Sequence, residues 1–208
     1  MQAEEDVVAD GDVVLSAEIL AKTMSPRPTG DGKVDIALRE VAAGDADIYE
    51  RMFCDPTMMS HLGGPLPRGS IEAKLRHDID EATSGRAWIY MIQPSCGDPS
   101  VVGGNVVLWA QESHGVSISE IGWMVLPEFQ GRGIGKAAVR LLLRRARDAG
   151  RWGVVHAYPG VANTASNAIC RSLGFTLIGR HDAVYAGRSL PTNHWHIHPV
   201  NLTEPSAD

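Results

Sequence analysis

Gln130-Gly131-Arg132-Gly133-Ile134-Gly135-Lys136 is the stretch of this sequence that decides the fold, because a strand pattern precedes it and a helical pattern follows it. The apolar, β-branched run 118–126 ends at Pro127, and an uninterrupted helical pattern continues to Ala149. A strand, a glycine-rich turn and a helix N-terminus together make an anion site, since free N–H groups converge there and the helix dipole favours negative charge. The glycines also let the backbone approach a phosphate closely and adopt positive φ where needed. We therefore expect a phosphate or pyrophosphate ligand.

The spacing of the glycines excludes two familiar nucleotide motifs. A Walker A loop would need Gly where Gln130 stands and Ser or Thr where Ala137 stands. The dinucleotide fingerprint would need a third Gly where Lys136 stands, and it would be expected early in a βαβ unit rather than past the middle of the chain.

The pattern Gln-x-x-Gly-x-Gly, formed by Gln130, Gly133 and Gly135, resembles the acetyl-CoA pyrophosphate loop of the GNAT superfamily of N-acetyltransferases. The preceding stretch, 119–129, is similar to that family's fourth strand. The stretch 163–175 is similar to its following helix and Leu-Gly-Phe exit. The three motifs occur in the family's order and separation, which makes the resemblance far more specific than the loop alone.

Length and composition are those of one α/β domain. The formal net charge of -6 over 208 residues argues against a nucleic-acid partner, which would demand a basic surface. Cys54, Cys96 and Cys170 form neither a disulfide framework nor a metal motif, which fits a reducing cytoplasm. Acidic residues stand where a signal peptide would be basic, and no apolar run approaches membrane length. We expect a soluble cytoplasmic protein with no membrane partner.

The chain divides into an N-terminal extension (1–33), one domain (34–200) and a C-terminal tail (201–208). The extension is expected to be flexible or loosely docked, with a dimer-contacting arm as the alternative. Strand patterns cover 34–39, 87–93, 101–110, 118–125, 154–158, 176–180 and 193–200, and helical patterns cover 45–53, 70–82, 136–149 and 163–174. The resemblance implies an α/β fold of the α+β type, a single GNAT-like domain with a mixed, twisted sheet of about seven strands flanked by helices.

The helix after the loop is amphipathic. Its predicted buried stripe consists of Ala137, Ala138, Leu141, Leu142 and Ala146, and its basic stripe consists of Lys136, Arg140, Arg144, Arg147 and Arg151. Cations toward a helix C-terminus suit the dipole, so the basic stripe is interpreted as a solvated face rather than a nucleic-acid surface.

Glu120 is the candidate general base, because many relatives of this type carry a catalytic glutamate on this strand in a similar Glu-Ile context. In a strand, residues 120, 122 and 124 share one face, opposite Trp123 and Val125. The resemblance implies acetyl transfer from acetyl-CoA to a primary amine by direct attack in a ternary complex. The amine must be neutral to attack, so a base or a water chain removes its proton. The alternative for Glu120 is a polar strand residue that faces solvent or pairs with an arginine.

The resemblance also assigns residues to acetyl-CoA, the expected co-substrate. Backbone groups of Met124, Val125 and Leu126 would hold the pantetheine arm as a substitute strand edge. The pyrophosphate would be held by Gln130, Gly131, Arg132, Gly133, Ile134, Gly135 and Lys136. Asn163 and Ser166 would contact the cofactor from the next helix, and Asn163 would also serve as its N-cap.

The general acid stays unassigned. Many relatives have a tyrosine four residues before the glycine of Leu-Gly-Phe, where this chain has Cys170. A thiol could protonate the leaving thiolate, but a cysteine at an apolar helix position is more often packed in the core. Ser166 or water could substitute, with Tyr158 and Tyr185 as remoter candidates. The absence of the tyrosine also resembles the ribosomal-protein alanine N-acetyltransferase-like branch and its small-molecule relatives.

His194, His196 and His198 alternate with apolar residues and would face one side of a strand. Such a row could bind a metal, but no acidic or cysteine ligand stands beside it, and a half-buried strand explains the same alternation. No metal is expected, and contact with the substrate is the remaining functional alternative. Specificity should come from the loop 58–68 and the segment 185–193, which flank the acceptor cleft in relatives.

These regions do not identify the amine, so a small molecule, a protein N-terminus and a lysine side chain stay open. We expect an enzyme that acts as a monomer or homodimer. The alternative is a non-catalytic acyl-CoA-binding sensor or partner module, which the missing tyrosine favours and Glu120 argues against.

Overall fold

The computed structural model describes residues 34–95, 98, 100–113, 116–185 and 188–204, so the expected N-terminal extension lies outside the described residues. The strands are β1 (Ile36–Glu40), β2 (Ala87–Pro94), β3 (Gly104–Ser113), β4 (Val116–Val125), β5 (Val155–Ala157), β6 (Thr176–Tyr185) and β7 (Arg188–Ile197). The α-helices are α2 (Ala46–Phe53), α3 (Ile71–Thr83), α4 (Ile134–Ala149) and α5 (Thr164–Ser172). Short 3-10 helices are η1 (Ala43–Asp45), η2 (Arg68–Ser70), η3 (Pro127–Phe129) and η4 (Pro199–Asn201). No helix within this part of the chain is long and apolar enough to cross a membrane.

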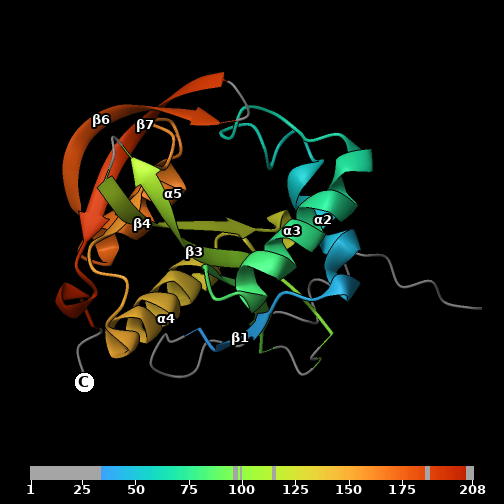
Figure 1. Ribbon diagram of the computed structural model, residues 1–208, viewed down its shortest axis with the longest axis horizontal. Coiled ribbons are helices and arrows are strands. Elements are labelled where there is room, and N and C mark those ends of the chain that lie inside the picture. The colour runs from blue at the N-terminus through green and yellow to red at the C-terminus, as the bar shows by residue number, and fades with distance from the viewer. Residues whose placement is uncertain (1–33, 96–97, 99, 114–115, 186–187, 205–208) are drawn as a thin grey trace, which may run out of the picture.

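The strands form one mixed sheet in the order β1-β2-β3-β4-β5-β7-β6. Neighbouring strands are antiparallel except β4 and β5, which run parallel. In Figure 1, α2 and α3 lie beside one end of the sheet and the β6–β7 hairpin forms the other. The predicted α/β class, with a seven-stranded sheet flanked by helices, is confirmed.

β4 forms the seam between the two halves of the sheet. It is paired with β5 at only two positions, Ser119 with Val155 and Glu120 with His156. The remainder of β4, residues 121–125, keeps β3 as its partner but has no strand beside it on the β5 side in the described structure. This open edge ends where the glycine loop begins.

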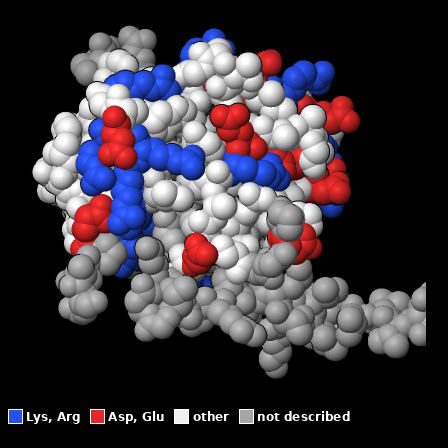
Figure 2. Space-filling view, turned by 90° about the horizontal axis from the view of Figure 1, so that it is seen from below, with Lys and Arg blue, Asp and Glu red and all other residues white. Residues whose placement is uncertain are grey.

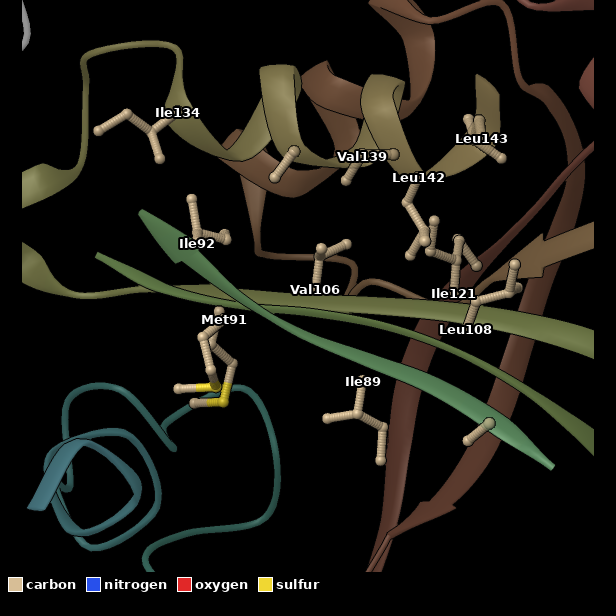
Figure 3. Packing of buried hydrophobic residues seen from close by; sticks show 14 of the residues in the cluster. Ile89, Met91, Ile92, Val106, Leu108, Ile121, Ile134, Val139, Leu142 and Leu143 are labelled. Atoms are coloured by element: carbon tan, nitrogen blue, oxygen red, sulfur yellow. The ribbon is translucent and has the colours of Figure 1, made fainter. Parts of the chain in front are cut away.

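The hydrophobic core fills both faces of the sheet. Figure 3 shows α4 packed on one face, with Val139 and Leu142 pointing toward Leu108 and Ile121 of the central strands. Met91 of β2 points to the opposite face, which α2 and α3 cover. Because Glu120 is the neighbour of Ile121 in a strand, its side chain leaves the sheet on the face away from α4.

The buried stripe of α4 differs from the predicted one. Ala137 and Leu141, which were assigned to it, are only partly buried. The buried residues are Ile134, Gly135, Ala138, Val139, Leu142, Leu143 and Ala146. These buried residues occur as adjacent pairs that repeat every four positions. A helix that lies on a sheet buries an arc wider than a single row of side chains.

The last two strands are longer than predicted and pair with each other antiparallel, with a register irregularity between Leu177 and Gly179. The sequence placed strands at 176–180 and 193–200, but β6 and β7 pair from Thr176 with His196 to Tyr185 with Arg188. β7 includes Pro191, although proline lacks an N–H for the ladder. On the edge away from β6, Gly160 pairs with Thr192, and the carbonyl oxygen of Pro191 accepts a hydrogen bond from the N–H of Val161 at 3.0 Å.

Residues 201–204, expected to begin the C-terminal tail, pack against the domain. Leu202 is buried in the core, and Thr203 donates its N–H to the end of α5. Glu204 accepts hydrogen bonds from Arg144 at 3.0 Å and Arg147 at 3.3 Å, so residues 201–204 belong to the domain. Part of the predicted basic stripe is therefore neutralised, and Figure 2 shows positive and negative side chains intermixed on this side of the molecule.

Candidate active site

The glycine loop leads from β4 and η3 into the N-terminus of α4. Gly131 and Gly133 adopt φ values of 72° and 76°, in the left-handed region that favours glycine. Gly133 is the N-cap of α4, and no side chain of the described residues caps this helix end. The N–H groups of the first helical turn are therefore left without a capping side chain and are oriented for an anion.

Gly135 has a different role from the other two loop glycines. Its backbone is helical, and a Cβ placed on it would lie 3.2 Å from side-chain atoms of both Val125 and Ile169. The missing side chain thus lets β4, α4 and α5 meet directly beneath the loop.

Other loop residues tie the anion site to the open edge of β4. The Nε2 atom of Gln130 donates to the carbonyl oxygen of Val125 at 2.8 Å and lies 3.8 Å from the sulfur of Met58. Leu126 donates its N–H to Gly103 on the β3 side. The buried indole N–H of Trp123 has no hydrogen-bond partner in the described structure. A buried donor without a partner is costly, so this indole suits a polar ligand lying along β4.

The remaining predicted cofactor residues also lie near this end of β4. Met124 and Ile134 are buried, whereas Arg132 and Lys136 are partly exposed at the loop. The other two predicted cofactor residues, Asn163 and Ser166, lie at the start of α5. The side-chain oxygen of Asn163 accepts a hydrogen bond from the N–H of Ser166 at 3.0 Å, which confirms the N-cap role of Asn163.

Glu120 lies in the middle of the sheet, between Trp109 of β3 and His156 of β5. Its carboxylate accepts a hydrogen bond from Nε2 of Gln111. Burial raises the pKa of Glu120 to about 7, although the hydrogen bond from Gln111 acts in the opposite direction. A carboxyl group with this pKa can exchange a proton near neutral pH. The side chain is only partly exposed and its partner is an amide, so neither a solvated residue nor an arginine pair describes it.

A group of rings borders Glu120 on the β5 side. We call it the imidazole cluster, and it consists of His156, Tyr158, His181, His194 and His196. The Nδ1 atom of His156 lies 2.7 Å from Nε2 of His194. Tyr158 lies 4.7 Å from the ring centre of His194 and 5.2 Å from that of His181. Burial raises the pKa of Tyr158, and the charge of Glu120 raises it further, which ties the cluster to the carboxylate.

The predicted row of three histidines is only partly present. His194 and His196 join the cluster from β7, but β7 ends at Ile197, and His198 is exposed and caps η4. Among the described residues, no three His, Cys, Asp or Glu side chains are arranged to hold a metal ion.

Cys170, a candidate acid, lies on α5 with no exposed surface. Burial raises the pKa of its thiol to about 12. This placement favours packing over proton donation to a ligand. Ser166 is partly exposed, and Tyr158 borders Glu120, while the side chain of Tyr185 lies outside the described residues.

The two segments expected to set specificity differ in structure. The loop 58–68 lies against the end of β5, where a Cβ on Gly160 would be 3.6 Å from Cβ of His61. The segment 185–193 is mostly strand β7 rather than a loop. Two surface cavities, of about 380 and 530 Å³, lie near Trp152 and beside α2, and neither is lined by Glu120.

Sequence reasoning missed the partners of Glu120. Gln111, His156 and His181 were not singled out, and Tyr158 was considered only as a remote acid. The alternation of each strand was visible, but the pairing of β4 with β5 depends on the connection through α4, whose length does not fix a register. Only the structure brings these side chains to one face.

The comparisons with known proteins agree with this geometry. A family model described as an acetyltransferase (GNAT) domain matches residues 35–176. No curated protein is significantly similar to the chain in sequence.

Solved structures share the fold at low sequence identity. A GNAT-family acetyltransferase from Bacillus anthracis aligns with a TM-score of 0.66 and 14% identity over 81% of this chain and 98% of the other. An acetyltransferase from Salmonella typhimurium that modifies the N-terminal serine of ribosomal protein L7/L12 aligns with a TM-score of 0.65 and 18% identity, over 80% of this chain and 96% of the other. The microcin C7 self-immunity acetyltransferase MccE, in complex with acetyl-CoA and AMP, aligns with a TM-score of 0.64 and 19% identity, over 85% and 99%.

Proposed function

The chain belongs to the GNAT family of acetyltransferases, and from that premise we propose that it transfers an acetyl group from acetyl-CoA to a primary amine by direct attack in a ternary complex, with Glu120 as general base. The enzyme class, an acetyl-CoA-dependent N-acetyltransferase, follows from the family. One observation carries the proposal. The uncapped N-terminus of α4, the open edge 121–125 and the carboxyl of Glu120 meet along a single strand.

Acetyl-CoA is the co-substrate that this arrangement fits. Its pyrophosphate would lie on the loop 130–136, and its pantetheine arm would follow the open edge at Met124 and Val125. Donors near that path include the indole N–H of Trp123 and the side-chain amide of Asn163. The acetyl-CoA complex of the neighbour MccE supports the same ligand here.

The acceptor is a primary amine, on a small molecule or at a protein N-terminus. Support for the second alternative is the neighbour that modifies the N-terminal serine of L7/L12. The imidazole cluster, which borders Glu120, and the loop 58–68, which lies against Gly160, are the regions that would select among amines.

Glu120 would act on the attacking amine. The neutral nitrogen attacks the thioester carbonyl carbon, a C–N bond forms, and the C–S bond breaks as the thiolate leaves. The proton lost by the nitrogen passes to the Glu120 carboxylate, whose pKa of about 7 leaves much of it ionised at neutral pH. Free N–H groups along 121–125 could stabilise the oxyanion that forms on the carbonyl oxygen.

The proton needed by the leaving thiolate would come from water, Ser166 or Tyr158. Ser166 and Tyr158 are partly exposed, whereas Cys170 is enclosed in the core. The absence of a tyrosine at position 170 is compatible with activity, because CoA thiolate is a stable leaving group that water can protonate.

A binding and turnover experiment tests the proposal. Calorimetry should detect acetyl-CoA binding, and thiol release should be stimulated by at least one member of a panel of primary amines that includes peptides with free N-termini. Failure to bind acetyl-CoA at millimolar concentration would refute the cofactor assignment. Tight binding without turnover on any amine would favour a non-catalytic acyl-CoA sensor.

A further inference from the structure

The imidazole pair His156 and His194 is placed to do more than line the acceptor site. His156 is the direct partner of Glu120 on the parallel ladder, so the two side chains leave neighbouring strands on the same face. Strands about 4.8 Å apart bring such side chains within reach of each other, directly or through one water.

The contact between the two imidazoles is a hydrogen bond through which a proton can move. Their facing nitrogen atoms, Nδ1 of His156 and Nε2 of His194, are 2.7 Å apart, so one ring donates and the other accepts. Nε2 of His156 and Nδ1 of His194 take no part in this contact. Both residues are only partly buried, so the second ring is open to solvent.

We propose that His156 and His194 form a relay that carries the proton from Glu120 to solvent after each acetyl transfer. The proposal rests on the proposed function and deepens it. Protonated Glu120 gives its proton to Nε2 of His156, the proton on Nδ1 of His156 passes to Nε2 of His194, and Nδ1 of His194 releases a proton to water. Glu120 is again a carboxylate, and each imidazole again holds one proton, now on Nε2. Proton exchange with water returns both rings to the Nδ1–H tautomer before the next transfer.

The surroundings of the pair keep it ready to accept a proton. Burial lowers the pKa of His156, with a further contribution from His196. Burial also lowers the pKa of His194, and the neighbouring His156, His181 and His196 lower it further. The charged or titratable groups that face the pair are Glu120 from β4, Tyr158 after β5, His181 from β6 and His196 from β7. Both rings are therefore neutral at pH 7, and each can pass a proton on without storing it.

His194→Gln separates a relay from a structural role. The amide can keep a hydrogen bond to Nδ1 of His156, but it cannot transfer a proton through itself. The relay predicts that kcat falls about tenfold, less than for a group that takes the substrate proton directly, while KM for acetyl-CoA is unchanged. It also predicts that kcat of this variant rises with the concentration of imidazole buffer, whereas wild-type kcat does not. His198→Gln, an exposed residue just after the same strand, is the matched control and should behave as wild type.

Two outcomes would overturn the relay even in an active enzyme: unchanged kcat in His194→Gln, or a reduced kcat that imidazole does not restore. A second measurement needs no acceptor. In nitrogen-15 spectra of the imidazole side chains, the His156 signals should shift with the same midpoint pH at which Glu120 titrates. Glu120→Gln should abolish that shift while acetyl-CoA binding persists. If the His156 signals do not change when Glu120 titrates, the relay is wrong. The proposed function is tested separately, by the turnover of the wild-type enzyme.

Discussion

Glu120 has a side chain whose surroundings work against its charge. Trp109 and His156 flank it on the adjacent strands, and burial there disfavours the charged carboxylate, whereas the hydrogen bond from Gln111 offsets part of this effect. This arrangement holds the carboxyl near its protonation midpoint at neutral pH, which suits a group that must take up and release a proton in each cycle. It also predicts a cost in folding stability at high pH.

The stability cost follows from the direction of the shift. The pKa of Glu120 is about 7 in the folded protein and 4.5 in its ordinary state. Between these values the unfolded chain has already lost the proton that the folded protein keeps, so stability falls as pH rises from about 4.5 to 7. Glu120→Gln should remove this fall, which is at most roughly 3 kcal/mol before allowance for partial exposure.

Urea unfolding at pH 5 and pH 8 measures the effect. The stability of Glu120→Gln relative to wild type should be greater at pH 8 than at pH 5. The control variant Glu72→Gln, at an exposed position, should show no such difference. A difference between Glu120→Gln and wild type that does not change with pH would show that Glu120 is not held protonated by burial.

At the residue scale, the sequence singled out Glu120 as the candidate base but did not predict its setting. Glu120 could be identified from its Glu-Ile context on the strand just before the glycine loop. Gln111 and His156 could not, because their proximity depends on strand register. Cys170 illustrates the opposite case, since its apolar helical context correctly favoured burial.

Among the elements, the N-terminus of α4 carries the cofactor assignment. Gly133 caps this end with φ of 76°, and Gly150 caps the C-terminal end with φ of 67°. A β-branched residue is strained at either position, and a Cβ at Gly133 would also lie 3.1 Å from Val34, so both substitutions should lower stability, Gly133→Val by more. Only the first disturbs the proposed anion site.

The matched pair Gly133→Val and Gly150→Val therefore separates binding from folding. Calorimetry should show that Gly133→Val weakens acetyl-CoA binding by about tenfold or more, the loss expected from one misplaced charge-assisted hydrogen bond. Gly150→Val should keep wild-type affinity, although its Tm falls as well. Equal affinities for the two variants would place the pyrophosphate elsewhere.

The elements themselves were largely predictable, because strand and helix periodicities are local. The element order and most boundaries follow from alternation, caps and glycines. The errors came from tertiary context. The buried arc of α4 depends on the sheet beneath it, and the length of β7 depends on its pairing with β6.

At the scale of the whole molecule, β4 divides the sheet, and the two halves supply different parts of the site. Strands β1 to β4, with α4, build the open edge and the anion site, whereas β5, β6 and β7 supply the imidazole cluster. Glu120 lies where the halves join, because the β4–β5 ladder ends at that residue. In the proposed reaction, acetyl-CoA, the amine and Glu120 would therefore meet where the two halves of the sheet join.

The pH dependence of kcat for wild type and Glu120→Gln, measured with an amine identified from the panel, tests the central claim most directly. We predict that Glu120→Gln binds acetyl-CoA normally but has kcat lowered by about 10²- to 10⁴-fold. In wild type, activity should rise with pH through about 7. In the variant this acidic limb should be lost, and only the ionisation of the amine itself should remain. Near-normal kcat with an unchanged profile would contradict the account and leave Glu120 a structural residue.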